Sequence, residues 1–293
     1  MRRWWAIVRA TALEIASEPL ALLLTLSALG LAVLTPAMHY HQFGEASRMA
    51  RDAGLSALLV GGLAFAVFCT IKSVRREIES GTLQMALAHP VSRTAFFLSK
   101  LAGAAIAYLG FAVTVSAASL TTVNGAAIGG EIAAKTGDIA VLYRPSLAVA
   151  VAAIVLPPVV GALLNRFGRF RFALTATVTA LVTASLGICF RFDATLAARF
   201  LPVALALVFP GLVFIAAAGA FAVRFRDNAS ASLAGLLFAV SLPALGSYYL
   251  SDALSKGAPA PWGFISLAAA ASLPFVAGFA LLGVHLFKGR DIA

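Results

Sequence analysis

The sequence predicts an all-α integral membrane protein. Its residues are 61% hydrophobic and only 12% charged, whereas soluble domains are near half apolar and a quarter charged. The mean hydropathy is +0.95, and long apolar runs separate short clusters of basic residues. A soluble protein of this composition would have too little polar surface to cover its core. We therefore expect a bundle of helices that cross a bilayer.

Charge and cysteine content exclude two other classes. The formal net charge of +10 does not indicate nucleic-acid binding, because clusters of Lys and Arg between apolar runs are typical of membrane topology. The two cysteines, Cys69 and Cys189, fall near the ends of different apolar runs that the predicted topology places on opposite sides of the membrane. No disulfide or metal-thiolate framework is therefore expected.

Residues 1–18 are too polar to span a membrane but have the pattern of an amphipathic helix. At about 100° per residue, their apolar side chains fall within an arc of about 120°. The apolar residues are Trp4, Trp5, Val8, Ala12, Ile15 and Ala16, and the polar remainder is Arg2, Arg3, Arg9, Glu14, Ser17 and Glu18. Two tryptophans beside basic residues suit a helix that lies in the headgroup layer. The alternative is a frayed tail with accidental amphipathicity.

Eight further stretches are apolar and long enough to cross about 30 Å of hydrocarbon. These predicted spans are Pro19–Met38, Gly54–Ile71, Leu101–Val123, Pro145–Leu164, Phe172–Phe190, Leu201–Val223, Ala231–Leu250 and Phe264–Phe287. None contains a Lys, Arg, Asp or Glu, each of which would cost about 2.5–3.5 kcal/mol at the centre of a span. Pro19 fits the first turn of its helix, which would enter the membrane at an angle to residues 1–18.

The basic residues predict the orientation. With eight spans, one set of loops holds Arg48, Arg51, Lys135, Arg144, Arg191, Arg199 and Lys256, and the alternating set holds the other 15 of the 22 Lys and Arg residues. The positive-inside rule then places both termini in the cytoplasm. We expect a multi-pass protein of the plasma (inner) membrane, with one transmembrane domain over residues 19–293.

The loop at residues 72–100 is the largest charged segment. The helix of the second span is expected to continue past Arg75 and Arg76 to Glu77 and Glu79, with ion pairs at helical spacing. Ser80 and Gly81 would end that helix. Ser92 is expected to cap the next helix, which would begin around Arg93 and run into the third span.

Inside this loop, a short helix is predicted over Thr82–Ala88, with Pro90 after it. Leu83 and Leu87 lie one turn apart on that helix. A short helix with two leucines beyond the headgroups presents apolar surface that fits a groove on a partner protein. The alternative, equally open on the residues alone, is that Leu83, Met85 and Leu87 pack on the protein's own helix ends.

The same segment resembles the motif between the second and third spans of ABC-2 type transporter permeases. The matching residues are Glu77-Ile-Glu79-Ser-Gly81-Thr82-Leu83, then Leu87, Pro90-Val-Ser-Arg93 and Lys100. The helix at residues 1–18 is similar to the family's elbow helix, and Phe287–Ile292 is similar to its basic-Arg-Asp ending. The copper-enzyme-maturation-like permease group is the most similar. Members more often have six spans, so six is the alternative to eight, and the hairpin around Arg166–Phe192 departs from the family pattern.

The resemblance implies a membrane-spanning permease subunit of an ATP-driven transporter, with export as the expected direction. Thr82–Ala88 would be the coupling helix that docks on a separate cytoplasmic ATP-binding subunit, with Gly81 allowing the close turn. Glu77 and Glu79 would approach basic groups on that subunit or anchor the loop. Arg93 and Lys100 would lie at the membrane face. A second permease copy, identical or related, is also expected.

Absent motifs narrow the function further. No Gly-x4-Gly-Lys-[Ser/Thr] phosphate loop occurs in the sequence, so we expect no enzyme activity and no cofactor on this chain, with ATP and Mg bound by the partner. Ion-coupled carriers usually keep an Asp, Glu or His within the membrane to relay protons or ions. In the predicted spans His285 is the one such residue, and it lies close to a cytoplasmic end, which disfavours an ion-coupled carrier. His39, His41 and Glu45 are too few for a metal site. The remaining alternative is a non-transporting membrane scaffold or assembly factor that recruits a cytoplasmic partner.

Overall fold

The computed structural model of the chain is all α-helical over the residues that it describes. These residues are 2–38, 46–79, 92–136, 144–168, 170–190, 193–225, 231–232, 235 and 262–289. They form α1 (Arg2–Ala16), α2 (Pro19–Met38), α3 (Ala46–Glu79), α5 (Arg93–Thr136), α6 (Arg144–Gly168), α7 (Phe172–Phe190), α8 (Ala194–Arg224) and α11 (Trp262–Lys288). The predicted fold class, an all-α membrane protein, is confirmed.

The described helices provide five or six candidate spans. Segments of α3, α5, α6, α8 and α11 are each long and apolar enough to cross a membrane. A sixth candidate is the bent pair of Trp4–Ala16 and Pro19–Leu34, whose axes differ by 63°. Eight spans were predicted, and the difference has two causes. The apolar part of α7, Phe172–Ile188, is shorter than the others, and nearly all of the predicted span Ala231–Leu250 lies outside the described residues.

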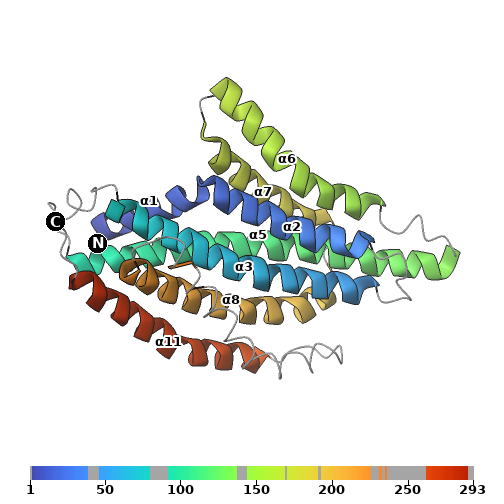
Figure 1. Cartoon of the computed structure of the whole chain (residues 1–293). Helices are drawn as coiled ribbons and strands as arrows, with labels where there is room; N and C mark the ends of the chain where they lie inside the picture. Colours follow the sequence, from blue (N-terminus) through green and yellow to red (C-terminus); the bar gives the residue numbers. More distant parts are fainter. Residues whose placement is uncertain are drawn as a thin grey trace.

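The centre of the bundle is formed by α3, α5 and α8, with α2 packed on one side and α11 on the other (Figure 1). Tyr108 of α5 is 1% exposed and marks the closest approach. A Cβ atom at Gly62 of α3 would lie 3.3 Å from the Tyr108 hydroxyl, and one at Gly211 of α8 would overlap the ring. The absence of side chains at these glycines lets the three helices close around the tyrosine.

The hairpin of α6 and α7 stands away from this bundle (Figure 1). It is attached through α7, whose Ala173 and Ala176 pack against Leu22 of α2. The Thr177 hydroxyl donates a hydrogen bond to the Ala16 carbonyl at 3.1 Å, which joins α7 to the C-terminal end of α1. The start of α7 therefore contacts the bend between α1 and α2, and farther along Ala180 and Ala184 of α7 pack on Ala117 and Ala118 of α5.

The N-terminal segment is helical and α2 begins at Pro19, as predicted, but the apolar arc of α1 has two environments. Val8 and Ile15 are 0% and 1% exposed inside the protein, whereas Trp4 and Trp5 are 44% and 56% exposed. The inner half of the arc therefore packs against α5, and the two tryptophans remain at the surface. The side chains of Arg2 and Arg3 lie outside the described part of the structure.

Gly103 of α5 permits this approach. A Cβ atom there would lie 2.5 Å from Thr11 Cβ and 2.8 Å from the Val8 carbonyl oxygen. Gly103→Ala is therefore expected to lower the melting temperature of the protein purified in detergent. Gly110→Ala, also in α5, is the matched control because nothing lies within 4 Å of its added Cβ. That change should be neutral or stabilising by up to about 1 kcal/mol through helix propensity. Equal effects of the two changes would contradict the close packing of α1 on α5.

Candidate functional site: the ion-paired base of the loop at residues 72–100

The two helices that flank the charged loop end and begin where the sequence predicts. α3 ends at Glu79 and α5 begins at Arg93. Ser92 caps α5, since the Ala95 N–H donates to Ser92 Oγ at 3.2 Å. The predicted coupling residues Gly81, Thr82, Leu83, Leu87 and Pro90 lie outside the described residues. The structure thus gives the base of the loop, meaning the last turns of α3 and the first turns of α5.

Lys100 joins three helices at this base. Its side chain is 4% exposed. Its Nζ atom lies 2.6 Å from Glu77 Oε1 of α3 and 3.1 Å from Glu14 Oε2 of α1. The Glu77 carboxylate is therefore engaged in an ion pair within the chain.

Glu18, at the bend after α1, forms a second centre of charge. Its carboxylate accepts from Lys72 Nζ at 2.6 Å and from Arg76 Nη1 at 2.8 Å. Arg76 Nη1 also lies 3.9 Å from Glu14 Oε1. We call the resulting set the elbow network. Its members are Glu14, Glu18, Lys72, Arg76, Glu77 and Lys100. Three carboxylates balance three cations, so the network brings no excess charge into the helix junction.

Two further contacts tie the loop base to the last helices. Arg75, 8% exposed at its side chain, contacts Glu79 Oε1 through Nη2 at 2.8 Å and Nε at 3.1 Å. Its Nη1 donates to the Phe225 carbonyl at 2.8 Å, which satisfies a backbone acceptor at the C-terminal end of α8. Arg93 Nη1 donates to the Lys288 carbonyl at the end of α11 at 3.3 Å. We call the end of the bundle where α3, α8 and α11 end and α5 begins the charged end.

Comparison with known families decides the class of the protein. A family model described as an ABC-2 family transporter protein matches residues 9–180, more than half of the 293-residue chain. The chain belongs to the ABC-2 transporter family. No curated protein and no solved structure matches it. The match does not confirm the copper-enzyme-maturation-like group.

Membership makes this chain a multi-pass membrane protein and a permease component of an ABC transporter. The matched region contains the C-terminal half of α1, the whole loop at residues 72–100 and the hairpin as far as Ala180. The hairpin, which was expected to depart from the family pattern, thus lies largely within the match. ABC-2 permeases in general act with an ATP-binding partner.

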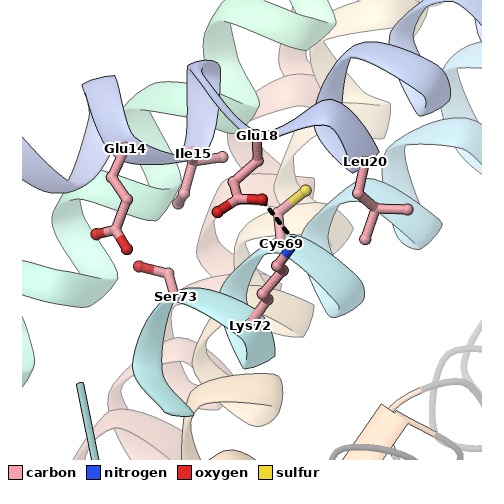
Figure 2. Close-up of a pocket in the computed structure, with 7 residues that line it drawn as sticks. All are labelled: Glu14, Ile15, Glu18, Leu20, Cys69, Lys72 and Ser73. Carbon is pink, nitrogen blue, oxygen red and sulfur yellow. Dashed lines mark hydrogen bonds and ion pairs between the residues drawn. The ribbon is translucent and has the colours of Figure 1, made fainter. Parts of the chain in front are cut away.

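The elbow network of this ABC-2 permease borders a small pocket (Figure 2). The pocket is lined by Glu14, Ile15, Glu18, Leu20, Cys69, Lys72 and Ser73. Glu14 and Ser73 point toward each other across it, and Glu18 points toward Lys72 (Figure 2). Ser73 Oγ and Glu77 Oε2 are buried, and neither has a hydrogen-bond partner among the described residues. Such oxygens can be satisfied by a bridging water, and the pocket supplies the polar neighbours that a water needs.

Sequence reasoning missed half of the elbow network. Glu14 and Glu18 were assigned to the polar face of α1, and Lys72 received no role. A signal was present, because Glu14 and Glu18 are four residues apart, as are Lys72 and Arg76. Residues four apart lie on the same face of a helix. Two such faces of opposite charge can meet when their helices cross, as these do.

The described spans offer only mild polarity elsewhere. In α5, the hydroxyls of Thr114, Ser119, Thr121 and Thr122 each donate to a carbonyl three or four residues earlier in the same helix. Thr175, Thr179 and Thr183 of α7 do the same. Within the described ranges, no group of three or more His, Cys, Asp or Glu residues is placed to hold a metal ion.

Burial of Lys100 predicts a large effect of its removal. Lys100→Gln would leave Glu14 and Glu77 without their shared cation, at a cost of about 3 kcal/mol, the lower end of the range for a buried pair. Lys72→Gln, in the same network, should cost about 1 kcal/mol or less because Lys72 is 47% exposed. Thermal melting of the purified variants in detergent measures the difference.

The double variant Lys100→Gln/Glu77→Gln provides the internal check. It should be more stable than the sum of the two single changes predicts, because it removes the opposite charges together. Additive losses, or equal losses for Lys100→Gln and Lys72→Gln, would contradict the role given to the buried ammonium.

Proposed function

We propose that this permease couples to a separate cytoplasmic ATPase through the loop at residues 72–100, and that it exports an amphipathic substrate across the plasma (inner) membrane. The observation that carries the proposal is the attachment of the loop base. Lys100 links the base to α1 and Arg75 links it to the end of α8. A force applied to the loop therefore reaches most of the bundle through short, charge-assisted contacts.

Within the loop, the proposed contact is the helix at Thr82–Ala88, whose Leu83 and Leu87 would fill a groove on the ATPase. Of the two acidic residues at the loop's start, Glu79 is the more accessible, with its side chain 52% exposed against 24% for Glu77. Glu77 serves instead to hold the loop to Lys100. ATP-driven movement of the partner would displace this unit together with α3 and α5.

The charge distribution supports an orientation with the charged end in the cytoplasm. Basic residues concentrate at that end, and few lie at the start of α3 and α8. An amphipathic substrate is favoured because the predicted spans offer hydroxyls rather than charged groups. One set of spans per chain suggests that a second permease copy completes the pathway.

The leucine pair gives the direct test of coupling. Purification of the tagged protein from its native host in mild detergent should yield an ATP-binding subunit in fixed ratio, with ATP hydrolysis. Leu83→Glu/Leu87→Glu should abolish both, because carboxylates cannot enter an apolar groove without a large desolvation cost. Leu83→Met/Leu87→Met is the matched control, which keeps the apolar surface and should retain both. A stable protein with no ATPase partner would refute coupling and favour a scaffold.

Topology can be tested with fusions at two described positions. Alkaline phosphatase is active only outside the cytoplasm, so fusion after Thr136 at the far end of α5 should be active. Fusion after Gly168, at the tip of the α6–α7 hairpin, should be inactive, whereas a fluorescent protein fused there should fluoresce. The reverse pattern would refute the orientation without bearing on the ATPase partner.

A further inference from the structure

The tip of the α6–α7 hairpin carries exposed aromatic and basic side chains in alternation. Phe167, Phe170 and Phe172 are 81%, 57% and 38% exposed. Arg166 and Arg171 are also exposed. A cluster of exposed phenylalanines of this kind marks a surface that contacts lipid or another protein. The tip therefore combines an apolar surface with a localised positive charge.

The arginines at the tip differ from the basic residues of the elbow network. Lys72, Arg76 and Lys100 are each paired with a carboxylate. Within the described residues, neither Arg166 nor Arg171 takes part in an ion pair or side-chain hydrogen bond. No acidic residue occurs in the sequence between Asp138 and Asp193. The counter-ion for this charge must come from outside this part of the chain.

An exposed apolar ridge leads along α6 to the tip. Its residues are Val151, Val155, Val159, Leu163 and Phe167, which are spaced four apart and 36%, 50%, 47%, 51% and 81% exposed. The opposite face of α6 is covered, since a Cβ atom at Gly161 would lie 3.0 Å from Ala176 Cβ of α7. Residues spaced by four form a continuous row along a helix, so the ridge is about 24 Å long. It is longer than one leaflet, about 15 Å of hydrocarbon.

The attachment of α7 fixes the level of the tip along the bundle. The Thr177–Ala16 hydrogen bond holds the second turn of α7 beside the bend between α1 and α2. Figure 1 shows the tip level with this bend along the bundle axis. Placed among lipid headgroups at this level, the tip would leave the ridge below it in the acyl region.

We propose that the α6–α7 tip binds an anionic phospholipid, with its phosphate at the Arg166 and Arg171 guanidiniums and one acyl chain along the ridge of α6. A guanidinium group can donate two parallel hydrogen bonds to one phosphate, which makes arginine well suited to binding a phosphate headgroup. The three phenylalanines would lie at the boundary between headgroups and acyl chains. Because α7 is bonded to α1, the bound lipid would also steady the bend that carries the elbow network. This site is independent of any ATPase.

The test compares lipid binding to the full-length protein by native mass spectrometry. Titration with a phosphatidylglycerol and with a phosphatidylcholine of the same acyl chains should show preferential binding of the phosphatidylglycerol. In Arg166→Gln/Arg171→Gln this preference should fall about fivefold for each guanidinium removed. Arg224→Gln/Lys288→Gln removes the same charge at the same end, on α8 and α11, and should keep the preference.

Two outcomes would overturn the proposal: no headgroup preference in the wild-type protein, or equal losses in the tip and control variants. Thermal melting of the wild-type protein in nanodiscs gives a second test of the lipid site, which does not require the Arg166→Gln/Arg171→Gln variant to fold. The wild-type protein should melt at a higher temperature in bilayers containing phosphatidylglycerol than in phosphatidylcholine alone. Identical melting temperatures, or an equal shift caused by inorganic phosphate, would refute a lipid site.

Discussion

The charged end of this permease depends on one buried ammonium group. Lys100 forms ion pairs with both Glu14 and Glu77, and these three residues belong to α5, α1 and α3. A buried ion pair of this kind is a weak source of net stability, because desolvation offsets most of the Coulomb attraction. Its effect is on geometry, since an unpaired carboxylate in this position would be strongly unfavourable. The helices are therefore restricted to the arrangement in which all three charges meet.

This restriction explains how the loop at residues 72–100 can act as a unit with the bundle. The loop leaves α3 after Glu79 and enters α5 at Arg93, so both of its attachments lie within two turns of Lys100. Arg75 and Arg93 extend the connection to the C-terminal ends of α8 and α11. Phe287 of α11 reinforces it by packing on Phe96 and Phe97, with ring centroids 6.3 Å and 5.6 Å apart.

Much of the fold could be predicted because hydropathy and local rules determine it. Apolar length located the helices, Pro19 located the start of α2, and the four-residue spacing of Arg75 and Glu79 anticipated their ion pair. The face of α1 that meets α5 could not be predicted, since an apolar arc does not distinguish lipid from protein as its cover. Nor could the pairing of Glu14 with Lys100, because these residues are 86 positions apart and helical spacing rules apply only within one helix. The close approach that brings them together depends on Gly103, whose role appears only once α1 is docked.

The length of α5 has a mechanical consequence. The helix has 44 residues, which at 1.5 Å per residue makes a rod of about 66 Å, roughly twice the hydrocarbon thickness. It is held at one end by Lys100 and extends past the neighbouring helices at the other (Figure 1). A tilt of about 5° around Lys100 would swing the end at Thr136, about 54 Å away at 1.5 Å per residue, by about 5 Å. A displacement that is small near the loop would then be larger at the far face, and α5 would act as a lever with its pivot at the ion pairs of Lys100.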